Sequence, residues 1–566
     1  MDNTIIEESS FKIKTSKAKG ILYGMFVGDA LGSSYEFQTI EYPVPNNKLQ
    51  KPLNMQGGGR FKLPPGGWTD DSSQGACLND ALIYMEVIYS KTGIREFPSK
   101  YFMESIYLWN KKGTNSGLSK SYPHVSIGLG SVVSQAINNW EIQRSKPSAD
   151  PASSLVEYRR KNGLENELCD GNGSTMRYGA CAVFAKSVEE AMQFAYLQSI
   201  VTTPGRESAD CSRLLAFLTY EAMHSKITDP LALKTWLLSK ENLERFVTIA
   251  NMQSLPKLKS DDGLTNLDYK TSGTVKLTSK VLQLCHPEEA TGDDIFINWR
   301  VSSEHYKLNP KQSKKGYYGA YVTEGVALVL NAFLNTNSFE ELISTLALAC
   351  GDADSNAAVA GQLAGAVYGV NAIPKTWIDD VNKHPLNQKT NSSDTANVTQ
   401  FIDNAIQIAL PQPELLAESS KVACDEKNLT GNNRNILLPN SSNSSNQNVN
   451  KYPDLRNEIT KTKTPVVFLK FFTEDEAIKF IDDHGIPFIP ELLDKNGKTL
   501  NQPDGNRIPN RWIVRLPING TKNGNPYSYY DDFRQNNPGL DLPDISNIPE
   551  ETIPPPTPMN VLGKKN

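Results

Sequence analysis

A chain of 566 residues is too long for one ordinary domain, so two or three domains are expected. Its net charge of −5 is weak over this length and argues against nucleic-acid binding through a global basic field. Seven scattered cysteines without a CxxC pair argue against a disulfide framework or a zinc site, and they favour a reducing, cytoplasmic compartment. The sequence has no apolar run of about eighteen residues, so we expect no membrane span.

The first two thirds of the chain have a helical apolar pattern. We expect a flexible leader over residues 1–15 and a compact, mainly α-helical domain over residues 16–413, because helical periodicity dominates there and alternating strand patterns are few. Residues 240–315 are less regular and include the polar stretch QSLPKLKSDDGLTNLDYKTSGT. This region is therefore expected to be an insertion within the helical domain.

The composition changes in the last third of the chain. Residues 414–460 include the run NSSNSSNQNVN, which cannot bury a core, so they are expected to form an Asn/Ser-rich linker. TPVVFLKFF and RWIVRLPI are strand candidates, and Thr473 with Glu476 fits the start of a helix. We expect a small α/β accessory module over residues 461–550 and a Pro-rich tail over residues 551–566.

Two helical stretches, GMFVGDALG and GQLAGAVYG, carry glycine at every fourth position. Residues four apart lie on the same face of a helix. Each interior glycine costs a helix about 1 kcal/mol relative to alanine, so three in a row are tolerated where a neighbour packs very close. Both helices are therefore predicted to be central and tightly packed. The glycines are Gly24, Gly28 and Gly32 in the first stretch and Gly361, Gly365 and Gly369 in the second.

Two clusters of acids and hydroxyls lie near these stretches. Residues 69–72 read TDDS, and residues 351–355 read GDADS. Neither cluster contains His or Cys, so both suit a hard cation such as Mg²⁺, Mn²⁺ or Ca²⁺ and do not suit zinc. Several carboxylates that converge on one point can hold two metal ions. Taken alone, each cluster is better explained by helix capping, because Asp and Ser favour the first turn of a helix.

Four segments, taken in order, resemble the ADP-ribosylglycohydrolase family, which includes dinitrogenase reductase-activating glycohydrolase. GMFVGDALGSSYEF is similar to the opening helix of that family, and WTDDS is similar to its W-T-D-D-T metal segment. NGSTMR is similar to its N-G-x-x-M-R segment, and GDADSNAAVAGQLAGAVYG resembles its G-D-x-D-T closing segment and helix. The resemblance spans residues 16–380 with gaps.

The resemblance implies an all-α fold with a centre of two Mg²⁺ ions, or of Mn²⁺ in their place. Glu36 matches an acidic position that approaches the metals and the substrate in some members. Ser72 and Ser355 stand where the family usually has threonine, and serine keeps the hydroxyl. The implied metal ligands are Thr69, Asp70, Asp71, Asp352, Asp354 and Ser355. The implied catalytic residues are Glu36, Asp70, Asp71 and Asp354.

The family binds ADP-ribose through glycine-rich segments, and two loops of this chain resemble them. Backbone N–H groups that glycine exposes can hold phosphate oxygens, most readily where a helix begins. For the loop SIGLGS, an ordinary turn is an equally good explanation. The residues expected to bind ADP-ribose are Ser126, Gly128, Gly130 and Ser131 from SIGLGS and Asn172, Gly173 and Ser174 from NGSTMR.

Two further positions bear on this expectation. Arg177, at the end of NGSTMR, is expected to make a structural ion pair and not to touch the substrate. Position 203 is Thr in the segment TTPGRES, where the family often has His. Whatever that His does in relatives is therefore in doubt for this chain.

The implied function is a Mg²⁺-dependent hydrolase that removes ADP-ribose from a modified protein by cleaving the bond at C1 of the ribose. Arginine is the expected linkage, and serine or another acceptor stays open. The alternative is a non-catalytic ADP-ribose-binding regulatory or scaffold protein, which Thr203 favours and the full set of carboxylates disfavours. The partners are then ADP-ribose and an ADP-ribosylated protein, which the C-terminal module could recruit. The linker and module also fit a bacterial effector delivered into a host cell, although no secretion signal is readable.

Overall fold

The structure is a computed structural model, and the chain divides into two compact units. One unit comprises residues 1–388 and 395–432, and the other comprises residues 389–394 and 433–566. The described residues of the first unit are 3–49, 53–117, 126–146, 149–164, 169–259, 266–274, 276–301, 317–384, 386 and 397–410. In the second unit the described residues are those of its strands.

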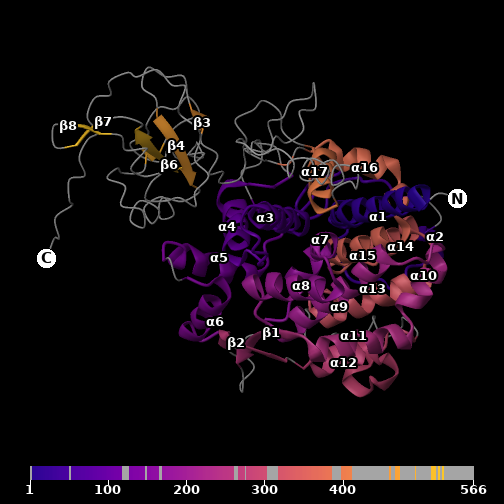
Figure 1. Ribbon diagram of the computed structural model, residues 1–566. Coiled ribbons are helices and arrows are strands. Elements are labelled where there is room, and N and C mark those ends of the chain that lie inside the picture. The colour runs from indigo at the N-terminus through magenta and orange to yellow at the C-terminus, as the bar shows by residue number, and fades with distance from the viewer. Residues whose placement is uncertain are drawn as a thin grey trace. The chain divides into compact units, whose positions relative to one another are not determined.

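The first unit is built from helices (Figure 1). Strands β1 (Ser254–Lys259) and β2 (Asn266–Thr274) form an antiparallel hairpin at its edge. The mainly α-helical fold predicted from the apolar periodicity is therefore confirmed. The α-helices are α1 (Asn3–Gly32), α2 (Asn46–Leu49), α3 (Asp70–Thr92), α4 (Ser99–Lys112), α5 (Ser131–Gln143), α6 (Pro151–Lys161), α7 (Gly179–Phe184), α8 (Val188–Thr202), α9 (Arg206–His224), α10 (Pro230–Leu237), α11 (Lys240–Met252), α12 (Ser279–Cys285), α13 (Val322–Asn335), α14 (Phe339–Leu348), α15 (Ala353–Tyr368), α16 (Lys375–Asn382) and α17 (Val398–Ala409). The 3₁₀-helices are η1 (Asn172–Arg177), η2 (Pro287–Glu289), η3 (Gly292–Ile297) and η5 (Val370–Ala372).

Helices α1 and α15 pack against each other along their two glycine faces. A Cβ atom on Gly24 would lie 2.0 Å from the carbonyl oxygen of Gly361, and one on Gly28 would lie 2.2 Å from that of Ala357. A real Cβ atom does not approach a backbone oxygen so closely, so the predicted tight packing of both helices is confirmed. Later positions of α1 contact earlier positions of α15, since Gly24 faces Gly361 and Gly28 faces Ala357. The two helices are therefore antiparallel. The end of α1 therefore lies beside the start of α15.

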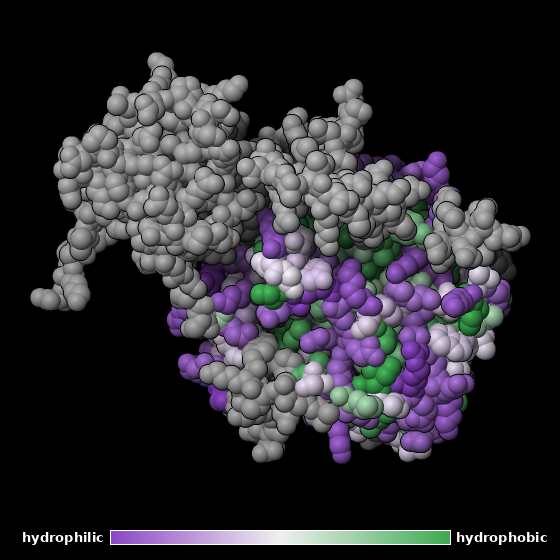
Figure 2. Space-filling view, viewed as in Figure 1, coloured by the Kyte–Doolittle hydropathy of each residue, from purple (hydrophilic) through white to green (hydrophobic). Residues whose placement is uncertain are grey.

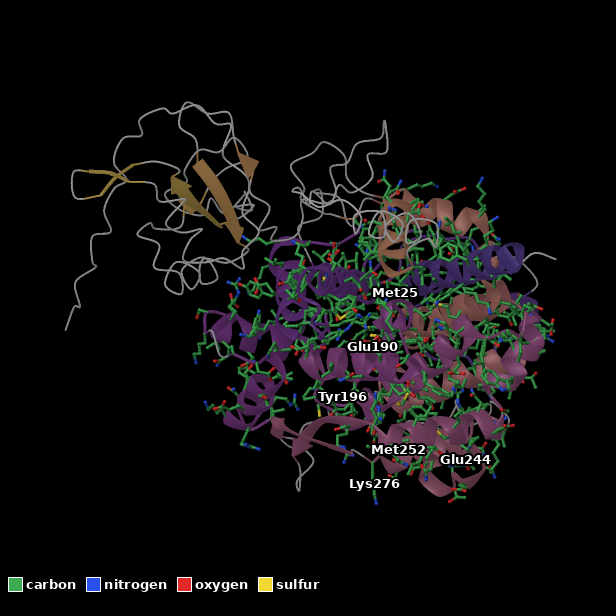
Figure 3. All side chains as sticks on the ribbon, viewed as in Figure 1. Met25, Glu190, Tyr196, Glu244, Met252 and Lys276 are labelled. Carbon is green, nitrogen blue, oxygen red and sulfur yellow. The ribbon has the colours of Figure 1, made fainter. Side chains whose placement is uncertain are left out.

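Helices α3, α7, α9, α13 and α14 surround this central pair. Near the start of α3, Gly75 faces the side chain of Met25 on α1, and a Cβ atom on Gly75 would lie 2.2 Å from the Met25 sulfur. Figure 3 shows Met25 among the closely packed side chains between the helices. The absence of a side chain at Gly75 thus lets the first turns of α3 approach α1.

The N-terminal residues differ from the expectation of a flexible leader. Helix α1 begins at Asn3 and continues without a break to Gly32. The sequence contains neither glycine nor proline between Asn3 and Lys19, so no residue interrupts the helix before the glycine face. Residues 3–15 are therefore a helical extension of α1.

The described part of residues 240–315 belongs to the core of the first unit. Helices α11 and α12 contact α9, and α12 also contacts α13. Leu243, Phe246, Val281 and Leu284 are fully buried. The expected polar stretch contains the hairpin of β1 and β2, whose register shifts between Pro256 and Lys257.

The second unit contains two small antiparallel sheets. The larger has the strand order β3 (Glu458–Ile459), β4 (Val466–Phe471), β6 (Trp512–Pro517), β5 (Glu491–Leu492), and the smaller pairs β7 (Gly520–Lys522) with β8 (Asn525–Tyr527). The strand candidates TPVVFLKFF and RWIVRLPI contain β4 and β6, which pair with each other over six residues. The predicted helix start at Thr473, the predicted tail and most of the predicted linker lie outside the described residues.

No helix among the described residues has both the length and the apolar character that crossing a bilayer requires. Figure 2 shows one face of the molecule, on which hydrophilic residues of the first unit predominate and hydrophobic residues form smaller groups between them.

Candidate metal centre

Two helices begin at the predicted acid clusters, and the fold brings their first turns together. Helix α3 begins at Asp70, and α15 begins at Ala353. Because α15 runs antiparallel to α1 and α3 packs on α1, both helix starts lie at the same end of the central pair. Thr69 Oγ1 donates a hydrogen bond to Asp354 Oδ2 at 3.2 Å, across 285 positions of sequence. The two clusters are thus one site.

Helix capping does not explain the side chains of these clusters. Thr69 is the N-cap residue of α3 and Asp352 is that of α15, yet neither side chain accepts a capping hydrogen bond from its helix. The Thr69 hydroxyl instead contacts Asp29, Asp71 and Asp354. The capping interpretation, favoured when each cluster is taken alone, is therefore wrong in the tertiary structure.

Asp29, in the middle of the first glycine stretch, holds the start of α3 in place. Its Oδ1 accepts from the Thr69 amide and hydroxyl at 2.9 Å, and its Oδ2 accepts from the Ser72 amide at 2.8 Å. Asp29 is fully buried, and this burial raises its pKa. Sequence reasoning did not predict a role for Asp29 at the site. The available signal was an acid on an otherwise small and apolar buried helix.

The buried carboxylates form two groups that could each hold a metal ion. One group is Asp29, Asp71 and Asp354, and the other is Glu36, Asp352 and Asp354, with one oxygen of each member within 4.8 Å of the others. Asp354 belongs to both groups. Asp70 belongs to neither, although it lies beside them and accepts a hydrogen bond from Gln74 at 3.0 Å.

Burial and mutual repulsion disfavour the charged form of these acids. The pKa of Glu36 is raised to about 12, first by burial and then by the charges of Asp354 and Asp352. The pKa values of Asp70, Asp71 and Asp354 are also well above the ordinary value of an aspartate. Burial is the larger cause, and the charges of neighbouring carboxylates are the second. Among the described residues, no Lys or Arg forms an ion pair with any of these acids. A cluster of this kind needs protons or a bound cation.

Three buried oxygen atoms at this site lack a hydrogen-bond partner among the described residues. They are Asp71 Oδ1, Ser72 Oγ and Glu36 Oε2. A buried polar atom without a partner is costly, and a bound ion is one of the accepted explanations. The donor atoms nearby are all carboxylate or hydroxyl oxygens, which suit Mg²⁺ or Mn²⁺. The residues present therefore fit a hard divalent metal.

Tyr317 connects Glu36 to the second cluster. Its hydroxyl lies 3.0 Å from Glu36 Oε1 and 2.9 Å from Asp352 Oδ1. Burial raises the pKa of Tyr317, so its hydroxyl keeps its proton and donates it. Asn172 donates to the other oxygen of Asp352 at 2.6 Å. Sequence reasoning missed Tyr317, because nothing in the stretch GYYGAY links it to Glu36, 281 positions upstream, or to Asp352, 35 positions downstream.

The loop SIGLGS lies against the candidate metal centre through Gly128. Its φ is +86°, and a Cβ atom there would lie 2.2 Å from Asp70 Oδ1, so no larger residue fits. Gly130 is the N-cap of α5 and Ser131 is its first residue, and both are exposed. Ser126 accepts a hydrogen bond from Asn110 at 2.9 Å. The loop thus offers the start of a helix beside the carboxylates.

The residues of NGSTMR divide between the site and the core. Asn172 contacts Asp352, as described above, and Gly173 lies beside Thr203, whose hydroxyl would be 3.7 Å from a Cβ atom at Gly173. Ser174 is fully buried, and its hydroxyl bonds to Ser199 and Ser212. The Ser174 side chain therefore faces the core, and the backbone of Ser174 is the part that remains for the expected contact with ADP-ribose.

Arg177 has a structural role, but the expected ion pair is wrong for the described residues. The guanidinium is fully buried and donates to Gln198, Gln74 and Thr202. Burial lowers its pKa to about 10. Gln74 in turn donates to Asp70, so Arg177 is connected to the candidate metal centre through a neutral amide.

Comparisons with known proteins agree with this geometry. The sequence model of the ADP-ribosylglycohydrolase family matches residues 11–407. The chain is 26% identical over 366 residues to ADP-ribosylarginine hydrolase Tri1 of Pseudomonas putida (strain GB-1), with 64% of this chain and 74% of the relative covered. It is 24% identical over 364 residues to ADP-ribosylarginine hydrolase Tri1 of Serratia proteamaculans (strain 568), with the same shares covered. It is 22% identical over 366 residues to human ADP-ribosylhydrolase ARH3, with 64% of this chain and 88% of the relative covered.

The family match covers more than half of the chain and includes every residue of the candidate metal centre. It also contains the four segments on which the resemblance was based. The chain therefore belongs to the ADP-ribosylglycohydrolase family.

Proposed function

We propose that this chain is a Mg²⁺-dependent hydrolase that releases ADP-ribose from a modified arginine side chain. As a member of its family, the chain is a hydrolase of ADP-ribosylated substrates. The arginine linkage is supported by the two bacterial relatives, whose names are ADP-ribosylarginine hydrolase. The observation that carries the proposal is the meeting of two buried, all-oxygen carboxylate groups that share Asp354.

The residues proposed to hold two Mg²⁺ ions, or Mn²⁺ in their place, are Thr69, Asp70, Asp71, Asp352, Asp354 and Ser355. Asp29 already accepts three hydrogen bonds from the start of α3. We therefore propose that Asp29 orients Thr69 and Asp71 and is not itself a ligand. When bound, such ions polarise substrate oxygens and lower the pKa of water.

The reaction adds water across the bond between ribose C1 and a guanidinium nitrogen. The water oxygen bonds to C1 as the bond between C1 and the nitrogen breaks. The water loses one proton, and the leaving nitrogen gains one. Glu36 is the best-placed residue to hold that proton, because its Oε2 is buried without a partner while Tyr317 fixes Oε1. Asp352 is kept in place by Tyr317 and Asn172 on its two oxygens.

The ADP-ribose part of the substrate is proposed to bind along SIGLGS and the start of η1. The exposed start of α5 offers free amide groups to phosphate oxygens, and Gly128 holds this loop against Asp70. A Cβ atom at Gly173 would lie 3.3 Å from the Val133 side chain and 3.7 Å from the Thr203 hydroxyl, so a larger residue would fill the space beside Thr203. Thr203, next to Gly173, is itself buried.

The test is a panel of ADP-ribosyl linkages scored for the release of ADP-ribose, with Mg²⁺ and with EDTA. We expect release from arginine with Mg²⁺ and loss of release in EDTA and in Asp354→Asn. Full activity in EDTA contradicts the metal dependence. Release from serine but not from arginine contradicts the linkage. Tight binding of ADP-ribose without release from any linkage supports the alternative of a non-catalytic reader.

A further inference from the structure

An aromatic and cationic stack lies beside the candidate metal centre. The Phe37 and Tyr317 rings are stacked, with centroids 5.3 Å apart and planes 14° apart. Phe61 meets the Phe37 ring edge-on at 5.7 Å, and the Arg60 guanidinium lies over the same ring at 5.0 Å from its centroid. The inner end of this stack is Tyr317, whose hydroxyl contacts Glu36 and Asp352. The outer end is Arg60, which is exposed.

The Phe37 ring is held in an unusual position for an aromatic residue. The backbone φ of Phe37 is +65°, a left-handed conformation that residues other than glycine rarely adopt. The residue is 45% exposed. Its amide donates to the Gly351 carbonyl, and the Gly351 amide donates to the Gln38 carbonyl, each at 3.0 Å. Strained residues that the surrounding structure over-determines cluster at ligand-binding sites. The backbone thus fixes an exposed ring between Glu36 and the loop that carries Asp352.

We propose that the exposed face of Phe37 is the binding site for the guanidinium of the modified arginine, and that Arg60 occupies this site until the substrate displaces it. This inference rests on the proposed function and names the specificity-determining residue for the arginine linkage. The leaving nitrogen must lie beside Glu36, and Phe37 is the next residue in the chain. A guanidinium is planar and stacks on aromatic rings, whereas a serine linkage offers no cation.

Displacement of Arg60 needs only its side chain to move. Two hydrogen bonds anchor the loop that carries Arg60. The Gly58 amide donates to the Leu63 carbonyl at 2.6 Å, and the Ser34 hydroxyl donates to the Gly57 carbonyl at 3.0 Å. A Cβ atom at Gly59 would lie 2.4 Å from the Ser33 carbonyl oxygen, so the loop is packed tightly on the segment before Glu36. Among the described residues, Arg60 has no carboxylate partner, and its contact with Phe37 is the one that a substrate must replace.

The experiment compares the full-length wild type with Arg60→Ala, Phe37→Leu and Phe37→Trp. For an arginine-linked substrate, Arg60→Ala is expected to lower KM by about two- to five-fold at unchanged kcat, the range of one exposed cation–π contact. Phe37→Leu is expected to raise KM by a similar factor, because the side chain stays apolar but loses its π face. Phe37→Trp is expected to retain binding.

A second readout does not require turnover. Binding of L-argininamide to the full-length protein in EDTA, followed by ligand-observed NMR, is expected to strengthen in Arg60→Ala and to weaken in Phe37→Leu. L-lysinamide carries the same charge without the planar group, and its binding is expected to respond less to Phe37→Leu. Lys62→Ala, which removes a cation from the same loop and leaves the Arg60 side chain in place, is the matched charge control.

Two results would overturn the inference. A higher KM in Arg60→Ala would show that Arg60 contacts the substrate directly, and equal effects of Phe37→Leu on L-argininamide and L-lysinamide would show that the ring does not select guanidinium. If the wild type releases ADP-ribose from no linkage, the proposed function fails, while the binding experiment still decides the role of Phe37.

Discussion

Thr69 and Asp354 are 285 positions apart in sequence, and the Thr69 hydroxyl donates to the Asp354 carboxylate at 3.2 Å. This hydrogen bond joins the first turn of α3 to the first turn of α15. It exists because α15 runs antiparallel to α1 and α3 packs on the same helix. The meeting of the two acid clusters is therefore a product of helix packing at one end of the central pair.

The metal-free protein is expected to lose stability as the pH rises, and Mg²⁺ is expected to restore it. The folded-state pKa values of Glu36, Asp70, Asp71 and Asp354 lie above their ordinary values of 4.5 and 3.8. The folded chain thus keeps protons that the unfolded chain releases, so stability is full below about pH 4 and falls as the pH rises.

Metal binding displaces these protons, so the stabilisation by Mg²⁺ is expected to be larger at about pH 8 than at about pH 6. Thermal denaturation with EDTA and with saturating Mg²⁺ at both pH values measures this difference. A shift in Tm by Mg²⁺ that is independent of pH would contradict the assignment of the carboxylates as ligands.

Asp354→Asn is expected to lower kcat/KM by about 100-fold or more, because the shared ligand of both groups loses its charge. The same change replaces a buried acid whose charged form is disfavoured by a neutral amide, so the metal-free variant is expected to be at least as stable as the wild type in EDTA. Steady-state kinetics and thermal denaturation together check both parts. Retained Mg²⁺-dependent activity in this variant would exclude Asp354 as a shared ligand.

Asp29→Asn is expected to weaken Mg²⁺ binding by about 10- to 100-fold, although Asp29 is not proposed as a ligand. The amide would turn an N–H₂ group toward the Thr69 or Ser72 amides, which now donate to Asp29. Calorimetric titration with Mg²⁺ measures the loss. Asp403→Asn, at a half-exposed acid that pairs with Lys19, is the matched control and is expected to bind Mg²⁺ normally.

Gly24→Ala is expected to destabilise the protein by about 2 kcal/mol or more, despite the higher helix propensity of alanine. The added methyl would meet the Gly361 carbonyl at 2.0 Å, and a backbone atom cannot move aside as a side chain can. Chemical denaturation in the presence of Mg²⁺ measures the change in the free energy of unfolding.

Gly130→Ala is the matched control for this packing effect. Its φ is −72° and a Cβ atom there would have no neighbour within 4 Å, so the stability change is expected to stay within about 1 kcal/mol. Equal losses in the two variants would mean that close helix contact is not the reason for the glycine face.

Much of the fold could be predicted from local patterns. Helical periodicity predicts the α class, and glycine at every fourth position predicts two tightly packed helices, because a missing side chain matters only where a backbone comes near. The structure differs from the expected flexible leader, because nothing in the sequence from Asn3 to Lys19 stops a helix and α1 already begins at Asn3.

The sequence by itself determined the chemistry of the candidate site: carboxylate and hydroxyl oxygens in two clusters, each at the start of a helix. It did not determine whether those acids cap helices or face each other, because acids favour the first turn of a helix in either case. Only the tertiary structure decided this, by packing α1 against α15 and α3. The same packing decided the roles of Asp29, Tyr317 and Arg177, whose partners lie far away in the chain. Such contacts have no signature in any local stretch, since they arise only when distant helices meet.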